Sequence, residues 1–526
     1  METPYGAIPD RLARDMSPQD MHDYLRARYR RRAVLGGAAV IATPLLWRQP
    51  GLPARRPGPR WIGFGADPAA QMHVSWSSGS ASGASARPGR PRVRWGLDRS
   101  YGHVADADAC VQVPVPAVAG EPAEHTFYSN VRLGRLRPGT AYHYSVSNDG
   151  RTWSADAVFR TAAAGRRDFR FTAFGDQAAS LATAAPMVSL VSSLRPAFHL
   201  VAGDLAYATP QGLKIPHVAG FSPAQWDKYL AVVGSRGAQS VPWQACVGAH
   251  ETEPLGDHGY AGFVTRFPQP YDHSSGSPVV HDFSYGNVAV IQLDGNDLSA
   301  QETVNTGYTR GAQTRWLRTR LARYRAAGSG IDFIVVVCNC CCYSSNQTHG
   351  SDGGLRDVWG PLFDRYRVDL VISGHVHAYE RTNPMRAGQP TAHVRSGGTV
   401  RPETDGTTYI CAGGGGNGLY RTWYGPTLGG DPGSPTRPKV WRWSGGDTAT
   451  GGSGHPEDQT DTATEYSAHR RAVWSCLVVD VTAPQAAGHP TSMKVRALMP
   501  EQTSSAVTSV ARRSVIDSVT LVRTAR

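Results

Sequence analysis

Two hydrophobic patterns divide the chain. Between residues 60 and 161 apolar and polar residues alternate in short runs, which Gly, Pro and Asp separate, at 71–76, 92–96, 140–146 and 157–161. Alternation with a period of two is the pattern of a strand that buries one face. These runs predict a β-sandwich at residues 57–163, which carries no set of catalytic side chains and therefore serves packing or spacing.

After the linker at residues 162–167 the pattern changes to apolar runs that end in glycine and polar residues. Such runs occupy residues 169–174, 197–202, 245–247, 333–337 and 368–373. Segments with apolar residues at helical spacing lie between them, for example 313–324. Buried strands that alternate with helices predict an α/β or α+β sandwich.

The last part of the chain again shows alternation. Residues 440–468 are polar and rich in glycine, which predicts a loop. Alternating runs lie at 472–480, 492–498 and 515–522. We expect them to close a second sheet against the preceding α/β or α+β sandwich.

The apolar run at 368–373 leads into Gly374-His375-Val376-His377. Loops at the carboxyl ends of parallel strands hold the chemistry of α/β folds. Two imidazoles on such a loop, after a glycine that permits a tight turn, can reach two metal ions, or one ion and a substrate. The pair alone is also compatible with two solvated histidines, so the other strand ends decide its meaning.

Four further strand ends carry polar side chains that suit a metal centre. They contribute Asp176, Asp204 with Tyr207, His250, and Asn339. Together and in this order, the five strand ends resemble the metallophosphoesterase superfamily (calcineurin-like phosphoesterases), and within it the purple acid phosphatase-like branch. The octapeptide 374–381 and Tyr207 are the most branch-specific parts of this resemblance, which covers roughly residues 60–526.

The resemblance implies a fold and its division. The family places a fibronectin III-like β-sandwich before the catalytic domain, and the turn at residues 136–142 is similar to a corner of fibronectin type III modules. We therefore expect an α+β protein in three parts. These are a leader at 1–56, the sandwich at 57–163, and a four-layer α/β/β/α metallophosphoesterase domain at 168–526.

The resemblance also implies roles for the polar residues. The ligands of a first metal ion would be Asp176, Asp204, Tyr207 and His377. Asp204 would bridge to a second ion on His375, and this donor set suits Fe³⁺ beside Fe²⁺, Zn²⁺ or Mn²⁺. Two such ions clamp a phosphate ester and lower the pKa of a bound water. His250 would donate a proton or bind phosphate, and His349 would contact the substrate.

Two positions depart from the family pattern, and both concern the second metal ion. Ala249 stands where the family has a ligating asparagine, and Asn339 stands where it has a histidine. A methyl group binds no metal, and an amide oxygen is a poorer ligand than imidazole for a transition metal. The second site is therefore expected to be depleted, with Asp204 and His375 as its remaining strong ligands.

The expected function is hydrolysis of phosphate monoesters, as in an acid phosphatase, by water at a two-metal centre. Two alternatives stay open. The depleted site also fits a catalytically impaired protein that binds metal or phosphate, and a phosphodiesterase or phospholipase of the same superfamily shares all the ligands. Substrate choice lies in loops such as 209–222 and 440–468, which have no readable signature.

Four cysteines flank Asn339, at positions 338, 340, 341 and 342. Three interpretations are open. The cysteines are small buried side chains, or one thiolate replaces the missing imidazole and favours zinc. In the third interpretation they form disulfides with the remaining cysteines, Cys110, Cys246, Cys411 and Cys476.

The formal net charge of +12 comes almost wholly from arginine, since lysine occurs only at positions 214, 228, 439 and 494. No stripe of basic residues with interleaved aromatics is present, so we expect no nucleic-acid binding. A basic surface attracts anionic substrates such as phosphate esters.

The first residues carry a candidate export signal. Arg30-Arg31-Arg32 precedes a modest apolar run at 33–47. This run is shorter than the roughly 18 apolar residues of a membrane span, so no stable span is expected. The arrangement resembles a twin-arginine signal, which implies a secreted or envelope-associated protein. An uncleaved amphipathic leader is the alternative.

Overall fold

The structure, a computed structural model, describes residues 56–78, 89–114, 125–177, 182–208, 224–253, 257–271, 273–428, 431–444, 455–463 and 465–525. The predicted twin-arginine signal and the loop at 209–222 lie outside these residues. Among the described helices, none has the length and apolarity needed to cross a bilayer.

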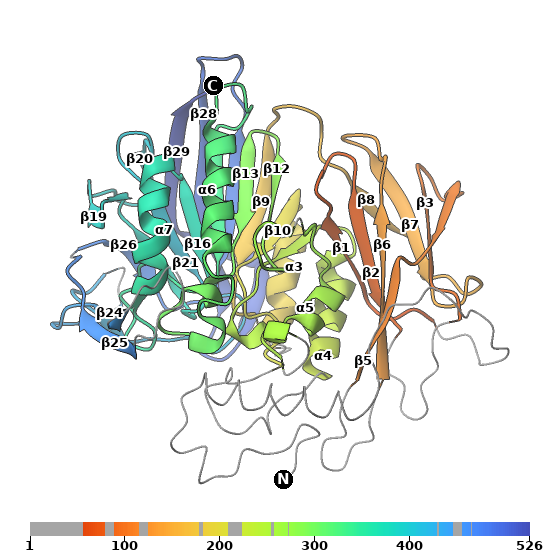
Figure 1. Ribbon diagram of the computed structural model, residues 1–526, viewed down its shortest axis with the longest axis horizontal. Coiled ribbons are helices and arrows are strands. Elements are labelled where there is room, and N and C mark those ends of the chain that lie inside the picture. Colours follow the sequence, from red (N-terminus) through yellow and green to blue (C-terminus); the bar gives the residue numbers. More distant parts are fainter. Residues whose placement is uncertain are drawn as a thin grey trace, which may run out of the picture.

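Two four-stranded antiparallel sheets form the N-terminal part, which confirms the predicted β-sandwich (Figure 1). One sheet has the order β1(Arg60–Phe64), β2(Met72–Ser77), β6(His125–Leu133), β5(Ala109–Pro114). The other has the order β4(His103–Asp106), β3(Arg92–Gly96), β7(Ala141–Ser147), β8(Ala157–Arg160). At the predicted corner the Arg137 backbone N–H donates to the Tyr142 hydroxyl at 2.9 Å, the bond of a tyrosine corner.

Two seven-stranded sheets form the rest of the fold. The first has the order β11(Trp243–Ala245), β10(Phe198–Val201), β9(Phe169–Phe174), β27(Cys476–Thr482), β28(Pro490–Gln502), β29(Val507–Thr524), β20(Gly398–Val400). The second has the order β12(His281–Tyr285), β13(Val288–Gln292), β14(Phe333–Cys338), β16(Leu370–Ser373), β21(Thr408–Ala412), β17(Tyr379–Thr382), β26(Ser467–Arg471). Strands β13 and β14 are buried along their whole length, which is why their sequences are almost continuously apolar.

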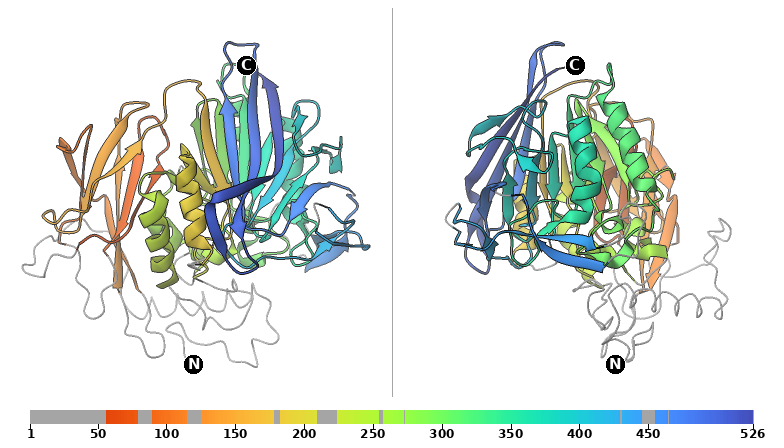
Figure 2. Two further views of the ribbon diagram at one scale, coloured as in Figure 1. Left: turned by 180° about the vertical axis from the view of Figure 1, so that it is seen from behind. Right: turned by 60° about the vertical axis from the view of Figure 1, so that its left-hand side comes forward.

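Helices cover the outer face of each sheet. Figure 1 shows α6(Ala312–Arg325) and α7(Gly353–Tyr366) in front of the second sheet. Seen from behind in Figure 2, α3(Ala184–Leu194) and α4(Ala224–Val233) cover the first sheet. Side chains from both sheets, such as Phe171 and Val335, form one core between them. The predicted four-layer α/β/β/α arrangement is confirmed.

The C-terminal alternating runs form strands, but they extend an existing sheet. Strand β27 pairs antiparallel with β9, at the middle of the first sheet, and β28 and β29 follow it outward. The prediction of a loop throughout 440–468 was wrong, because β24(Lys439–Ser444) and β25(His455–Thr460) pair as antiparallel strands and β26 follows.

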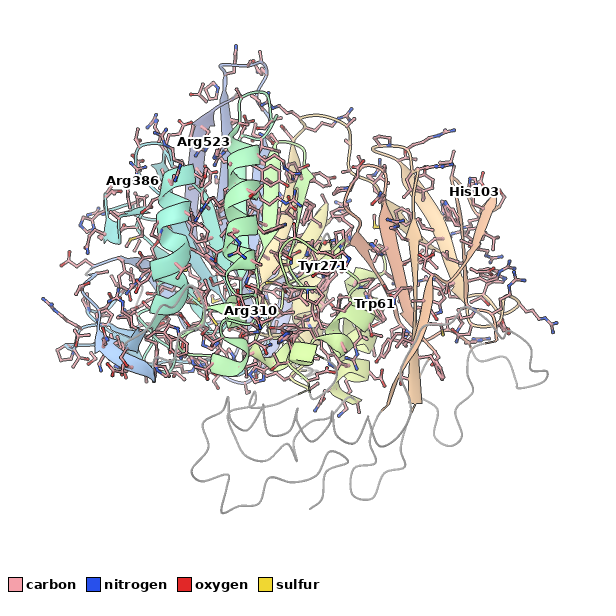
Figure 3. The ribbon with its side chains drawn as sticks, viewed as in Figure 1. Trp61, His103, Tyr271, Arg310, Arg386 and Arg523 are labelled. Carbon is pink, nitrogen blue, oxygen red and sulfur yellow. The ribbon has the colours of Figure 1, made fainter. Side chains whose placement is uncertain are left out.

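The β-sandwich and the catalytic domain share a hydrophobic interface. The Phe64 ring packs against Phe198 and Phe283, with ring centroids 5.9 and 5.6 Å apart. Trp61, which Figure 3 places at the junction, donates from Nε1 to the Arg266 carbonyl oxygen at 2.8 Å. The sandwich therefore contributes to the same core as the catalytic fold.

A buried histidine, His281, should make the stability of the protein depend on pH. His281 on β12 is buried, and burial together with the nearby His73 lowers the pKa of His281 to about 3. Because the unfolded chain takes up this proton near pH 6.5 and the folded chain does not, the free energy of unfolding falls as the pH drops below 6.5. The contribution should reach about 2–3 kcal/mol at pH 4.5, measured by urea unfolding at pH 7 and 4.5.

The matched variant is His281→Leu, which removes the titrating group. Its stability should fall less than that of the wild type over the same pH interval, since the acidic residues are common to both chains. An equal decline in the two chains would contradict the assignment to His281.

Candidate metal centre

Carboxyl ends of strands from both sheets meet at one edge of the sandwich. In the first sheet Asp176 follows β9, Asp204 follows β10, and His250 lies in the short helix η4(Ala249–Glu251) after β11. In the second sheet Asn339 follows β14, and the His375–His377 loop follows β16. The structure thus brings together the strand ends that carry the predicted ligands.

Three predicted ligands of the first metal ion form a tight cluster. The Tyr207 hydroxyl lies 2.9 Å from His377 Nε2 and 3.3 Å from Asp176 Oδ1. His377 Nε2 is itself 3.4 Å from Asp176 Oδ1. On the other side of its ring, His377 Nδ1 donates to the Gly418 carbonyl oxygen at 2.6 Å. This bond fixes the tautomer that leaves Nε2 available to a metal.

Two buried carboxylates lie side by side at this cluster. Asp176 is fully buried and Asp204 is 2% exposed. Burial, and next the charge of Asp204, raise the pKa of Asp176 well above its usual value. The His375 backbone N–H donates to both oxygens of Asp176, and the His250 backbone N–H donates to Asp204 Oδ1 at 3.1 Å. Buried like charges at this proximity call for a cation, so the donor set fits a metal ion.

The backbone is strained at four of these residues. The φ angles of Asp176, Asp204, Tyr207 and His375 are +58°, +53°, +50° and +66°. Such conformations cost free energy in residues other than glycine, and they gather at functional sites. Here they turn four side chains, from the three loops after β9, β10 and β16, toward one region.

Glycines allow the loops to approach the carboxylates closely. A Cβ atom on Gly374 would lie 2.5 Å from Asp176 Oδ2, and one on Gly248 would lie 2.2 Å from Asp204 Oδ1. Any larger side chain at either position would therefore displace a carboxylate.

Asn339, which replaces the family's histidine, is buried. Its Nδ2 donates to the Ala202 carbonyl oxygen at 2.9 Å, and among the described residues its Oδ1 has no hydrogen-bond partner. An unpaired buried oxygen is costly unless a ligand uses it. The methyl group of Ala249 is also buried and offers no donor.

Glu251, which the sequence analysis did not single out, holds two of the loops. Its carboxylate accepts hydrogen bonds from the backbone N–H groups of Asp204, Leu205 and Gly248 at 2.7–2.8 Å. The bonds tie the loop after β10 to the loop after β11.

The two histidines predicted to act on the substrate flank the cluster. Both are half-buried. The ring of His250 lies 4.2 Å from that of Tyr207, and the ring of His349 lies 4.1 Å from that of His375. Beside His375 the structure adds Gln301 and Glu302, which the sequence analysis missed. The overlooked signal is the apolar run at 288–293, another buried strand that ends in Asp-Gly.

All eight cysteines of the chain are free thiols, so the structure contains none of the disulfides considered above. Cys338, Cys340 and Cys342 pack in the core beneath α6 and α7, and burial raises the pKa of each thiol. Cys341 and Cys411 both donate to the Gly374 carbonyl oxygen. This favours the interpretation as small buried side chains.

Comparison with known proteins agrees with this geometry. Residues 61–161 match the family model of the purple acid phosphatase N-terminal domain, and residues 169–379 match that of the calcineurin-like phosphoesterases. An uncharacterized protein of Mycobacterium tuberculosis is 32% identical over 417 residues, which are 72% of this chain and 74% of the relative. A phosphoenolpyruvate phosphatase of Allium cepa is 25% identical over 347 residues, 63% of this chain and 65% of the relative.

Among solved structures, a purple acid phosphatase from yellow lupin (Lupinus luteus) seeds has the same fold. Its TM-score is 0.60 at 17% identity, and the match covers 89% of this chain and 74% of the lupin protein. The chain therefore belongs to the calcineurin-like phosphoesterases, a class of metal-dependent hydrolases of phosphate esters. Within that class it belongs to the purple acid phosphatase family, as its motifs predicted.

Proposed function

We propose that this chain hydrolyses phosphate monoesters at a two-metal centre whose first site is complete. The observation that carries the proposal is the clustering of Asp176, Tyr207 and His377 within 3.4 Å of one another. Asp204, whose charge raises the pKa of Asp176, completes this site. Carboxylates, a phenol and an imidazole suit Fe³⁺.

The second site would use Asp204, His375 and the unpaired Oδ1 of Asn339. With Ala249 in place of asparagine this set is poorer than the family's own, and it suits Fe²⁺, Zn²⁺ or Mn²⁺. When bound, the two ions would supply Lewis acidity toward a phosphate ester and lower the pKa of a water.

The side chains around the centre would position and protonate the substrate. The His250 ring lies against Tyr207 and is half-buried, so it can reach both the centre and the solvent. From that place it would hold a phosphate oxygen or give its proton to the leaving-group oxygen. The hydrogen bond from His377 Nδ1 to the Gly418 carbonyl oxygen would hold the imidazole ring in its orientation.

The test is hydrolysis of an aryl phosphate monoester by the purified chain, with an aryl phosphodiester assayed in parallel. We expect turnover of the monoester that a chelator abolishes and added divalent metal restores. Turnover of the diester alone would favour the phosphodiesterase alternative. Absence of turnover from acid to alkaline pH in metal-loaded protein would refute the catalytic proposal and favour the impaired protein.

A further inference from the structure

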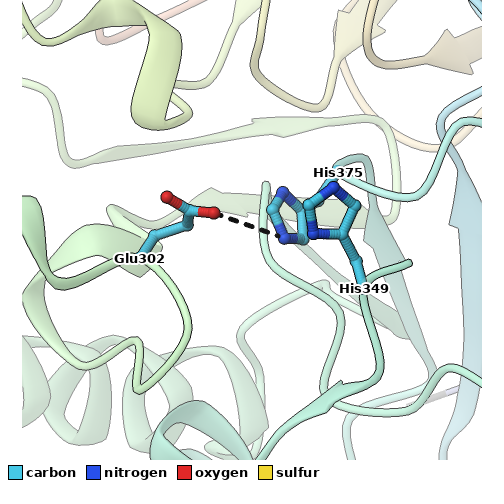
Figure 4. Close-up of side chains that lie close together, drawn as sticks. All are labelled: Glu302, His349 and His375. Atoms are coloured by element: carbon cyan, nitrogen blue, oxygen red, sulfur yellow. Dashed lines mark ion pairs between the residues drawn. The ribbon is translucent and has the colours of Figure 1, made fainter. Parts of the chain in front are cut away.

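Glu302, His349 and His375 form a second group of metal-binding side chains beside the first cluster. Their ligand atoms, one from each side chain, all lie within 4.8 Å of one another. Figure 4 shows the Glu302 carboxylate directed toward the two imidazole rings, with Glu302 Oε1 3.7 Å from His375 Nε2. The three residues come from the loops after β13, β14 and β16. Three separate loops therefore deliver ligands to one place.

We propose that these three side chains bind a divalent cation, the second metal ion that Ala249 and Asn339 no longer hold as the family's residues do. The inference rests on the proposed function, since His375 belongs to both ligand sets. Two histidines and one glutamate are a known ligand set of catalytic zinc, with a further position left open. Ligand atoms of a tetrahedral zinc ion lie about 3.3 Å apart, so side-chain movements of about 1 Å close the group.

Gln301 already turns both imidazoles toward one point. His375 Nε2 donates to Gln301 Oε1 at 3.1 Å, and Gln301 Nε2 donates to His349 Nδ1 at 2.7 Å. Once His375 carries its proton on Nδ1, an ion that displaces this amide finds lone pairs of both rings directed at it. The amide oxygen of Gln301 is itself a possible additional ligand.

The loop that carries Glu302 is held rigidly by Asp352, the N-cap of α7. Asp352 is fully buried, and its Oδ2 accepts hydrogen bonds from the Ser299 hydroxyl and the Gln301 backbone N–H. The Glu302 backbone N–H donates to the Ser299 hydroxyl oxygen at 2.7 Å. A ligand fixed by such outer contacts gives up little conformational entropy when it binds an ion.

Burial supports the same assignment. Glu302 is 3% exposed and His375 is 4% exposed. A carboxylate in such a place is stabilised by a cation. In this assignment His349 is a metal ligand, and the substrate contact predicted for it falls to other groups.

The experiment measures metal stoichiometry, which does not depend on turnover. The full chain is stripped with a chelator, titrated with Co²⁺ or Zn²⁺, and analysed for metal content and for the visible absorption of bound Co²⁺. We expect two ions in the wild type, and one ion with a changed Co²⁺ spectrum in Glu302→Gln and in His349→Ala. Loss of one ligand should lower the affinity of the protein for the second ion at least about 100-fold. The control His103→Ala removes an exposed imidazole of the β-sandwich and should keep both ions.

A further chain combines Glu302→Gln with Ala249→Asn and Asn339→His, which rebuild the family's ligands. Recovery of the second ion there would show that Glu302→Gln removes a ligand and leaves the fold intact. If this triple variant still binds only one ion, Glu302 and the family's residues at positions 249 and 339 do not serve the same ion, and the claim is overturned.

Two ions and an unchanged spectrum in both single variants overturn the proposal and leave the first site untouched. Failure of the wild type to bind any ion contradicts the proposed function itself, so the two failures are distinct.

Discussion

Replacement of His377 with alanine should lower the rate of aryl phosphate hydrolysis by on the order of 10³-fold or more, because the proposed first metal ion would lose its imidazole ligand. His377 Nε2, the Tyr207 hydroxyl and Asp176 Oδ1 face one another at 2.9–3.4 Å and mark one position for an ion. Metal content should fall with the rate. Both are measured on variant and wild type purified in parallel, by a p-nitrophenyl phosphate assay and elemental analysis.

Two controls separate loss of a ligand from loss of the fold. His103→Ala, which removes an exposed histidine far along the chain, should keep the wild-type rate. Imidazole added to His377→Ala should restore part of the rate. In the wild type the His377 ring stacks on the Tyr420 ring with centroids 4.2 Å apart, so its deletion leaves a space that free imidazole can fill. A His377→Ala protein with full metal content and an unchanged rate would place the ion elsewhere.

Most of the candidate site could be predicted because its residues follow apolar runs directly. Asp176 stands two residues beyond the end of β9, and Asn339 immediately follows β14. In such cases the strand fixes where the next residues lie, and parallel strands bring their ends to one edge. Local sequence is then sufficient to identify both the strand and the side chain.

The apolar run at 288–293 identifies strand β13, but Gln301 and Glu302 stand nine and ten positions beyond its end at Gln292, so the strand does not fix where they lie. Hydrogen bonds to Asp352, some fifty residues further along the chain, decide the path of that loop. Contacts of this kind depend on the tertiary fold and leave no periodic pattern in the sequence.

The same limit applies to sheet pairing. Alternation identified the strand at 476–482, but its pairing with β9, about three hundred residues earlier, depends on the burial of both faces in the folded protein. In the hairpin of β24 and β25, the glycine-rich composition concealed two strands. Packing reveals one of them, since Val440 is fully buried and the Trp443 indole donates to the Leu298 carbonyl oxygen.

Replacement of Arg381 with methionine should lower the free energy of unfolding by about 3–5 kcal/mol, because it leaves Asp517 buried without its charge partner. Arg381 on β17 donates to both oxygens of Asp517 on β29, from Nε at 2.6 Å and from Nη2 at 3.2 Å. Both residues are fully buried, and the pair joins the two sheets across the sandwich. Equilibrium unfolding in urea, or the thermal midpoint at pH 7, measures the loss.

The matched control is the double variant Arg381→Met with Asp517→Leu, which removes both charges. It should regain most of the lost stability, since the cost of a broken buried pair is largely the cost of the charge left behind. The Tyr379 hydroxyl, which donates to Asp517 at 2.7 Å, then loses its acceptor, so recovery should be incomplete. If the single and the double variant were equally stable, Arg381 would stabilise the fold through its packing and not through its charge. The end of the octapeptide 374–381 would then serve packing between the sheets, while its two histidines would serve the proposed metal centre.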